Sequence, residues 1–133
     1  MTLTPSELQR VHAVRAGLRQ FHRWSGSHVR AAGLTPALHD LLLSIQAPNN
    51  DGGPSITTAA TALALTHHST VELVNRAAAS GHLQRAPDHQ DRRVVRLTLT
   101  PAGEHALSSL APHHREQLRR LEDLLTATKL DGQ

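Results

Sequence analysis

Apolar residues recur every three or four positions through the first quarter of the chain, which predicts one long amphipathic helix. Between positions 6 and 31 these residues follow one another at steps of three, three, four, three and three. Such spacing places them on one side of a helix, close to a heptad seam. Thr4 suits the cap and Pro5 the first turn of this helix. The seam consists of Leu8, Val11, Val14, Leu18, Phe21 and Trp24.

A second helix is predicted by the same start signal. Gly33 ends the first helix, and the dipeptide Thr35-Pro36 repeats the cap-and-proline start for a helix over 37–47. Four apolar residues then recur at helical spacing, which gives this helix a wide buried face. They are Leu38, Leu41, Leu42 and Ile45.

The middle of the chain predicts short elements separated by turn residues. The sequence PNNDGGP at 48–54 is a loop, because glycine and proline interrupt regular structure there. Thr57 or Thr58 caps the next helix, and Thr66 caps the one after it, which Gly81 ends. The expected bounds are a strand stub at 55–57, helices at 59–65 and 67–80, strands at 82–85 and 94–99, and a polar connection at 86–93.

The last part of the chain predicts two more helices. Thr100-Pro101 repeats the start signal, and Pro112 divides the segment 101–130, because proline removes an internal hydrogen bond. A leucine seam follows this segment, with His114 in its missing position: Leu107, Leu110, Leu118, Leu121 and Leu125. The whole chain, 1–133, is therefore expected to be one mainly α-helical domain with a small β-hairpin (α+β).

Composition narrows the class of protein. Of the 133 residues 38% are hydrophobic, and Phe21 and Trp24 are the only aromatic ones among Phe, Trp and Tyr, which favours helix packing over a large sheet. Cysteine is absent, so disulfides, thiolate zinc sites and cysteine redox switches are excluded. No signal peptide, membrane span or motif of an enzyme is recognised. We expect a non-enzymatic protein of the bacterial cytoplasm.

The size of the net charge says little about function, but the type of basic residue that carries it is informative. The formal net charge is +3, and Lys129 is the only lysine, so arginine carries the positive charge. Arginine makes bidentate contacts to phosphate and guanine, although a GC-rich genome enriches it equally well. Net charge alone does not indicate a nucleic-acid partner.

The order of elements over 35–100 is that of a winged helix-turn-helix. Two short helices joined by a tight turn precede a hairpin, the second helix enters a major groove, and the hairpin tip at 88–93 (the wing) reaches the minor groove. In the second helix Val71, Val74, Ala77 and Ala78 face inward. Asp91 is expected to pair with one wing arginine; we favour Arg93, which leaves Arg92 for DNA, and the reverse stays open. The candidate DNA contacts are His67, His68, Ser69, Thr70, Asn75, Arg76, Asp91, Arg92 and Arg93.

These residues carry a resemblance to the MarR family of transcriptional regulators. The matching stretches are 34–45 (LTPALHDLLLSI) and 66–103, in which the Asp-Arg-Arg wing and the following Leu-Thr-Pro-x-Gly are most specific. The resemblance implies a homodimer with interlaced helices at 5–33 and 101–130, and two DNA-reading units on a roughly palindromic operator. The two apolar seams also favour dimerisation, since a core this small cannot bury both. The third helix is richer in Thr and Ala than is usual for the family.

The resemblance further implies a small aromatic or anionic effector, held between the dimerisation helices and the DNA-reading unit. By position the candidates are Arg15, Arg19, Trp24, His28 and His39. The favoured function is a dimeric repressor released by such an effector.

Two other functions stay open. Eleven histidines suggest a metal- or haem-responsive sensor, in which Glu104 and His105 meet His39 across helices. The adjacent pairs His67-His68 and His113-His114 point to different faces, so neither pair chelates alone. No resident metal or cofactor is predicted. A non-sensing DNA-binding accessory protein is the third possibility.

Overall fold

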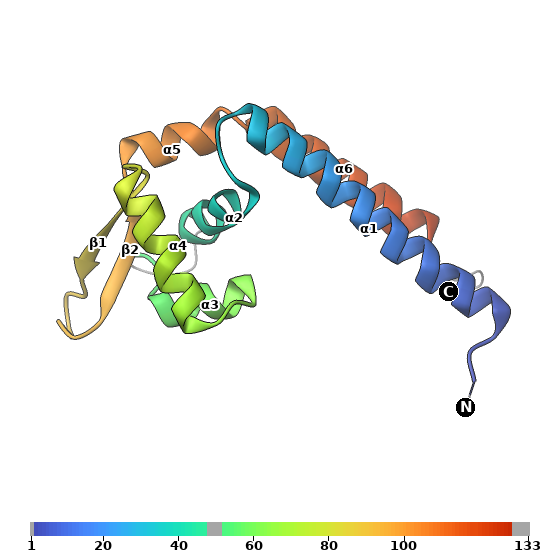
Figure 1. Ribbon diagram of the computed structural model, residues 1–133, viewed down its shortest axis with the longest axis horizontal. Helices are drawn as coiled ribbons and strands as arrows, with labels where there is room; N and C mark the ends of the chain where they lie inside the picture. The colour runs from blue at the N-terminus through green and yellow to red at the C-terminus, as the bar shows by residue number, and fades with distance from the viewer. Residues whose placement is uncertain (1, 48–51, 129–133) are drawn as a thin grey trace.

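A computed structural model describes residues 2–47 and 52–128 and shows, over these residues, six helices and one antiparallel hairpin (Figure 1). This confirms the predicted mainly α-helical fold with a small hairpin. Most of the predicted loop at 48–54 lies outside the described residues. The elements are α1 (Pro5–Ala31), α2 (Pro36–Gln46), α3 (Ile56–Leu63), α4 (His67–Ala79), β1 (Leu83–Pro87), β2 (Val95–Leu99), α5 (Pro101–Ser108) and α6 (Ala111–Ala127).

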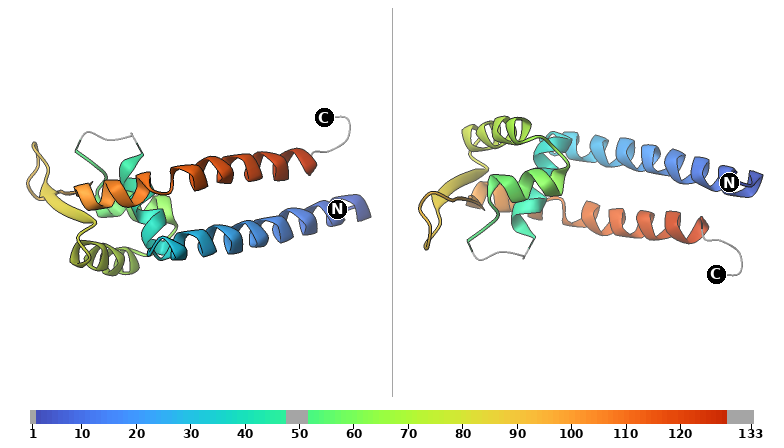
Figure 2. Two further views of the ribbon diagram at one scale, coloured as in Figure 1. Left: turned by 90° about the horizontal axis from the view of Figure 1, so that it is seen from above. Right: turned by 90° about the horizontal axis from the view of Figure 1, so that it is seen from below.

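The molecule has two parts of different shape, an arm and a head. The arm consists of α1 and α6, which lie side by side in opposite directions (Figures 1 and 2). The head consists of α2 to α5 and the hairpin, which projects away from the helices (Figure 2). Within the segment 101–130, which was predicted to hold dimerisation helices, α5 packs against α2 and β2 and therefore belongs to the head.

Three helices begin with the Thr-Pro signal that the sequence predicted. The hydroxyl oxygens of Thr4, Thr35 and Thr100 each accept the backbone N–H three residues ahead at 3.1 Å. A proline follows in the first turn of each helix, where its missing N–H costs no hydrogen bond. Local sequence therefore sets the starts of α1, α2 and α5. Pro112 likewise lies in the first turn of α6, which confirms the predicted division.

A single apolar core holds the head together. Leu41 of α2, Val74 of α4 and Leu97 of β2 are each 0% exposed, so helices and hairpin share one interior. The inward prediction for α4 holds for Val74 and Ala77, whereas Val71 and Ala78 are half-buried. The remaining buried members of this core are Ile45, Ala59, Leu73, Ala77 and Leu83.

The predicted strand stub at 55–57 is wrong. The Ser55 hydroxyl accepts the N–H of Thr58 at 3.1 Å, so Ser55, and not Thr57 or Thr58, caps α3. The segment before α3 makes one strand-like hydrogen bond to the hairpin: the Pro54 carbonyl accepts the N–H of Leu97 at 2.9 Å. Proline has no N–H to continue such a ladder, and the serine cap turns the chain into a helix at once.

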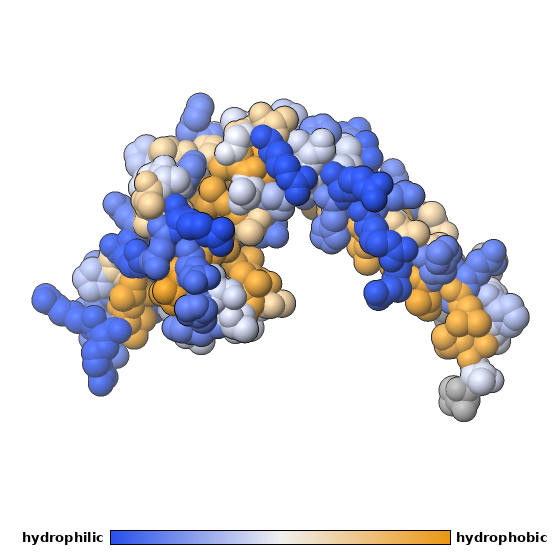
Figure 3. Space-filling model, viewed as in Figure 1, coloured by the Kyte–Doolittle hydropathy of each residue, from blue (hydrophilic) through white to orange (hydrophobic). Residues whose placement is uncertain are grey.

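The arm leaves much of its apolar surface uncovered. Leu118 and Leu125 of α6 are each 65% exposed, and Leu8 of α1 is 54% exposed. Figure 3 shows hydrophobic residues along the lower edge of the arm, whereas the projecting hairpin tip is hydrophilic. Among the described residues, none of the helices is both long and apolar enough to cross a membrane.

Candidate nucleic-acid interface

The leading end of α4 presents an exposed polar surface. The Thr66 hydroxyl accepts the N–H of Ser69 at 3.1 Å, which fixes the start of the helix. His67, His68 and Ser69 are exposed, as predicted, and His68 Nε2 lies 3.2 Å from Glu72 Oε1. The positive end of the helix dipole and these side chains therefore face solvent together.

Thr70 is not part of this exposed surface, which corrects the sequence interpretation. It is 0% exposed, and its hydroxyl donates to the Thr66 carbonyl at 2.8 Å. Residues four and seven positions further along, Val74 and Ala77, are also buried, so Thr70 lies on the inner face of the helix. Its burial excludes it from direct contact with a nucleic acid in this conformation.

The exposed middle of α4 is joined to the hairpin. Asn75 and Arg76 are exposed, as predicted. The Asn75 side-chain oxygen accepts a hydrogen bond from the Arg85 guanidinium on β1. Sequence reasoning did not single out Arg85, which is ten residues from its partner. This bond links the candidate recognition helix to the base of the wing.

Asp88 organises the wing and was also missed from the sequence. Its carboxylate accepts the backbone N–H groups of Gln90 and Asp91, each at 3.0 Å, and the Arg96 Nε at 2.9 Å. These donors, the Asp91 amide first and then the Arg96 guanidinium, lower the pKa of Asp88 to about 2. Arg96 also donates to the Gly53 carbonyl at 3.2 Å. An aspartate two residues before a turn amide is the local signal that indicates such a role.

The two wing arginines differ as the sequence predicted. Arg93 Nε donates to Asp91 Oδ1 at 3.1 Å, and this ion pair and hydrogen bond lower the pKa of Asp91. Arg92 is exposed, and within residues 2–47 and 52–128 no hydrogen bond or ion pair holds its guanidinium. The wing therefore presents one arginine that is fixed by a carboxylate and one that is available to a partner.

A hollow lies between the wing and the starts of two helices. Its volume is about 340 Å³, and both α3 and α4 direct their N-terminal ends toward it. Unpaired N–H groups at helix starts and an arginine beside them suit an anionic oxygen such as that of phosphate. The lining residues are Ser55, Ile56, Thr57, His67, Arg93, Val94 and Val95.

Two of the predicted effector residues line a second cavity, where the arm meets the head. Trp24 and His28 border a space of about 340 Å³ together with residues at the start of α6. The guanidinium of Arg120 lies 3.9 Å from the centre of the Trp24 ring, close enough for a cation–π contact. This cavity has aromatic walls, whereas Arg120, which was not predicted, lines the separate cavity between α1 and α6. The other lining residues are Ser109, Leu110, Pro112, His113 and Glu116.

The remaining predicted effector residues lie elsewhere. Arg15 and Arg19 are exposed on α1 and do not line this cavity. His39 is 3% exposed, and its Nε2 lies 2.9 Å from Nε2 of His114. The expected contact of His39 with Glu104 and His105 is wrong, because both of these are exposed on α5 and α6 supplies the partner instead.

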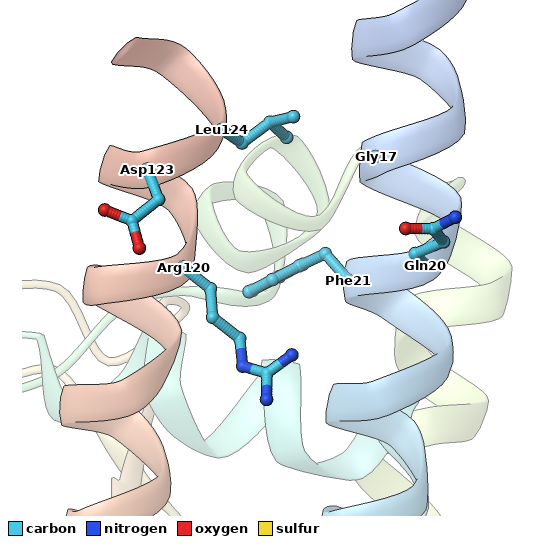
Figure 4. A pocket seen from close by; sticks show the side chains of 6 residues that line it. All are labelled: Gly17, Gln20, Phe21, Arg120, Asp123 and Leu124. Carbon is cyan, nitrogen blue, oxygen red and sulfur yellow. The ribbon is translucent and has the colours of Figure 1, made fainter. Parts of the chain in front are cut away.

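A third cavity opens between the two arm helices. In Figure 4 the side chains of Phe21, Arg120 and Leu124 extend into the space between α1 and α6. Its volume is about 330 Å³. Gly17 faces Leu124 there, and a side chain at position 17 would meet the leucine methyl groups, so the glycine sets the local spacing of the helices. Gln20 and Asp123 complete the lining.

Among the described residues, the histidines are not grouped as a metal centre would need. Over residues 2–47 and 52–128, no group of three or more histidine, cysteine, aspartate or glutamate side chains is placed to hold a metal ion. The geometry therefore gives no support to the metal-sensor alternative.

Comparison with known proteins agrees with the wing and helix arrangement. No protein-family model matches the sequence. Over 90 residues, 68% of the chain, it is 30% identical to the transcriptional activatory protein BadR of Rhodopseudomonas palustris, and it spans about half of BadR (51%). AbsC, a MarR family transcriptional regulator from Streptomyces coelicolor, matches with a TM-score of 0.79 and 21% identity over 97% of this chain and 93% of AbsC. This chain has the fold of the MarR family transcriptional regulators.

A second solved structure extends the likeness to every residue of the chain. BpsR of Bordetella bronchiseptica, whose DNA binding is described as regulated by 6-hydroxynicotinic acid, matches with a TM-score of 0.65 and 22% identity over 100% of this chain and 86% of BpsR. The fold expected from the Asp-Arg-Arg wing and the flanking helices is thus confirmed. The matched proteins are described as transcriptional regulators, in agreement with the sequence interpretation.

Proposed function

We propose that this protein is a homodimeric, DNA-binding transcriptional repressor that a small aromatic or anionic effector releases from a roughly palindromic operator. The proposal rests on Arg92, which is exposed and has no partner among the described residues. It lies at the tip of a wing whose base is fixed by Asp88, beside the polar start of α4. Major and minor groove contacts from one unit require this arrangement.

The proposed DNA contacts divide into positioning and reading. The hollow between α3, α4 and the wing receives a backbone phosphate, with Arg93 and two helix starts around it. His67, His68 and Ser69 enter the major groove, and Asn75 and Arg76 flank it. Arg92 enters the neighbouring minor groove, where the negative potential favours arginine. Asp91 acts through Arg93 and does not touch DNA itself.

Dimerisation is supported by the exposed apolar face of the arm. Six large hydrophobic side chains on or beside α1 and α6 are at least 39% exposed, and two packed helices alone cannot cover both of their faces. A second copy that brings its own arm supplies the missing layer. These side chains are Leu3, Leu8, Val11, Leu18, Leu118 and Leu125.

An effector is supported by the cavity at the junction of arm and head. Trp24 lines it as an aromatic wall, and the Arg120 guanidinium, which lies 3.9 Å from the centre of that ring, lines the cavity between α1 and α6 and offers a cation for a carboxylate there. BpsR, which shares the fold, is described as regulated by the carboxylate-bearing ring compound 6-hydroxynicotinic acid. A ligand that wedges between α1 and α6 at this point would alter the spacing of the two heads and so weaken binding to DNA.

The direct test is selection of bound sequences from random duplexes with the purified full chain. We expect a palindrome with half-sites about 10 base pairs apart, centre to centre. Arg92→Ala should weaken binding to the selected operator and reduce the salt slope by about one. Arg30→Ala, which removes an exposed arginine at the end of α1, is the matched control and should change neither. No enrichment, or an unchanged affinity and slope for Arg92→Ala, would overturn the proposal.

The direction of regulation needs a separate measurement, because BadR is named an activatory protein. A dimer that covers one face of the operator blocks access to it, which supports repression. A reporter gene placed behind the selected operator should be less active when this protein is expressed. A more active reporter would overturn repression and leave DNA binding intact.

A further inference from the structure

Four histidines meet where the arm joins the head, and the proposed DNA contacts use none of them. His28 lies near the end of α1, His39 on α2, and His113 and His114 in the first turn of α6. We refer to these four residues as the histidine junction. It joins the two helices of the arm, α1 and α6, to α2 of the head, so a change there bears on how the head is held against the arm.

The first contact of the junction is a hydrogen bond between two imidazoles. His39 Nε2 and His114 Nε2 lie 2.9 Å apart, and the rings stack with centroids 5.1 Å apart. Such a bond needs one Nε2–H donor and one bare Nε2 acceptor. A first proton leaves this bond in place, because the charged ring donates to the neutral one. A second proton puts hydrogen on both facing nitrogens, so the bond is lost once both rings are charged.

The second contact is a stack of aromatic rings. The His113 ring lies parallel to that of His28, at 9° and 4.9 Å between centroids, and 4.7 Å from the Trp24 ring. Its Nε2 is 3.1 Å from the Ser25 hydroxyl oxygen. His113 is 7% exposed, and its Nδ1 has no hydrogen-bond partner among the described residues. A second proton on this ring would thus be buried without an acceptor.

The surroundings of the histidine junction also disfavour a positive charge on its imidazole rings. Burial lowers the pKa of His39, His113 and His114, and the neighbouring histidines lower the pKa of the first two further. His113 and His114 lie in the first turn of α6, where the helix dipole disfavours a cation.

Few carboxylates are placed to compensate a charged junction. Asp40 Oδ1 lies 3.8 Å from His39 Nδ1, but burial raises the pKa of Asp40, and His22 on α1 faces it as well. On the other side Arg120 faces His113, and Glu116, which lines the adjacent cavity, pairs with Arg119 and Arg120. One carboxylate at most can therefore offset the charge of several protonated histidines.

We propose that the histidine junction is a proton-sensitive joint, which holds the head against the arm at neutral pH and loosens it in mild acid. Its effect on DNA rests on the proposed function, because the two heads of a dimer must keep a fixed spacing to bind two half-sites. Acidification would then release the operator without any organic effector.

The direction of the pH dependence follows from linkage. His39, His113 and His114 have the ordinary pKa of 6.5 in the unfolded chain and a lower pKa in the folded protein. Below about pH 6.5 the unfolded chain therefore binds more protons, so stability is complete above that pH and falls as the pH drops toward the lowered values. Each histidine whose pKa is lowered by one unit reduces the folding equilibrium constant by roughly tenfold across this range.

Trp24 supplies a direct measurement, since it is the only tryptophan and touches two junction histidines. Its fluorescence, recorded on the full chain from pH 8 to 5, should change sigmoidally with a midpoint below 6.5. His39→Gln/His114→Gln keeps hydrogen-bonding groups without titration and should reduce the change, and His113→Gln added to this pair should remove most of what remains. His105→Gln, an exposed histidine on α5, is the matched control and should leave it intact. A flat profile, or an unaltered one in the double variant, would overturn the proposal.

Two further readouts separate the proposal from its alternatives. The transition should persist in EDTA, and its loss there would overturn a proton switch in favour of a bound metal. Affinity for the selected operator should fall at least tenfold from pH 7.5 to 5.5 for the unmodified chain and clearly less for His39→Gln/His114→Gln. Equal losses would overturn the coupling to DNA. Absence of DNA binding at both pH values would refute the proposed function alone, because the fluorescence transition does not depend on it.

Discussion

The head and the arm use similar apolar residues to opposite effect. In the head Leu41, Leu42 and Leu97 are 0% exposed, because helices and a hairpin enclose them from several directions. In the arm Leu118 and Leu125 remain 65% exposed, because among the described residues α6 packs mainly against α1. The difference shows that leucine residues are buried only where several elements pack around them, and that leucine content alone does not produce a core. The head is complete within one chain, whereas we propose that the arm is complete only in a pair.

The largest expected effect comes from opening the core of the head. Leu97→Ala removes a fully buried side chain from β2, and the cavity and lost burial should lower the free energy of unfolding by about 2–5 kcal/mol. Urea unfolding at one fixed protein concentration measures this loss. Leu65→Ala, at a side chain that is 41% exposed beside α3, is the control and should cost much less. Equal losses would mean that the head is not the better-enclosed part.

A smaller effect is expected from the arm, and it should depend on concentration. Leu118→Ser/Leu125→Ser removes two exposed leucines from α6, which should weaken the proposed dimer at least tenfold, or about 1.4 kcal/mol. Analytical ultracentrifugation over a dilution series measures the shift. Leu65→Ser on the head should leave the dimer unchanged. A double variant that associates as tightly as the original chain would rule out the apolar arm as the interface.

The smallest effect on stability is expected in the wing, which polar bonds rather than a core hold in place. Asp88→Asn removes the ion pair with Arg96, and it should loosen the wing while the rest of the head stays folded. Because the pKa of Asp88 is lowered to about 2, its contribution is complete above pH 4 and is lost as the pH falls toward 2. The stability difference between the two proteins should therefore be constant from pH 7 to 5 and shrink below pH 4.

Glu122→Gln, at an exposed carboxylate of α6, is the control for this comparison. Thermal unfolding of all three proteins in a pH series provides the measurement. A difference that already disappears between pH 7 and 5 would contradict the role of Asp88, and would place its titration in the range of the histidines instead.

Local signals made much of the fold predictable from the sequence. The Thr-Pro starts of α1, α2 and α5 depend on neighbours three residues away, so the sequence specifies them directly. The pairing of Arg93 with Asp91 is equally local. The start of α3 was misplaced because Ser55, Thr57 and Thr58 are all good caps, and only the path of the chain after Pro54 selects the first of them.

Contacts between distant residues could not be predicted in the same way. Thr70 is polar and was therefore expected at the surface, but it is buried because its side of α4 packs on the core of the head. Arg85 and Asn75 meet because the hairpin folds back along α4, and His39 meets His114 across 75 positions. In each case a pattern along one element shows which face a residue shares, but not which element lies opposite.

The single hydrogen bond from Leu97 to the Pro54 carbonyl has a consequence for solubility. A two-stranded hairpin has two open edges, and unpaired edge groups can recruit strands from other molecules. At Leu97 the segment 53–54 occupies the outer edge of β2, and Gly53, with φ of +92°, comes so close to the Leu97 carbonyl that no side chain would fit. Proline at 54 cannot extend this pairing. The hairpin that is proposed to reach DNA is thereby protected on one side from edge-to-edge aggregation.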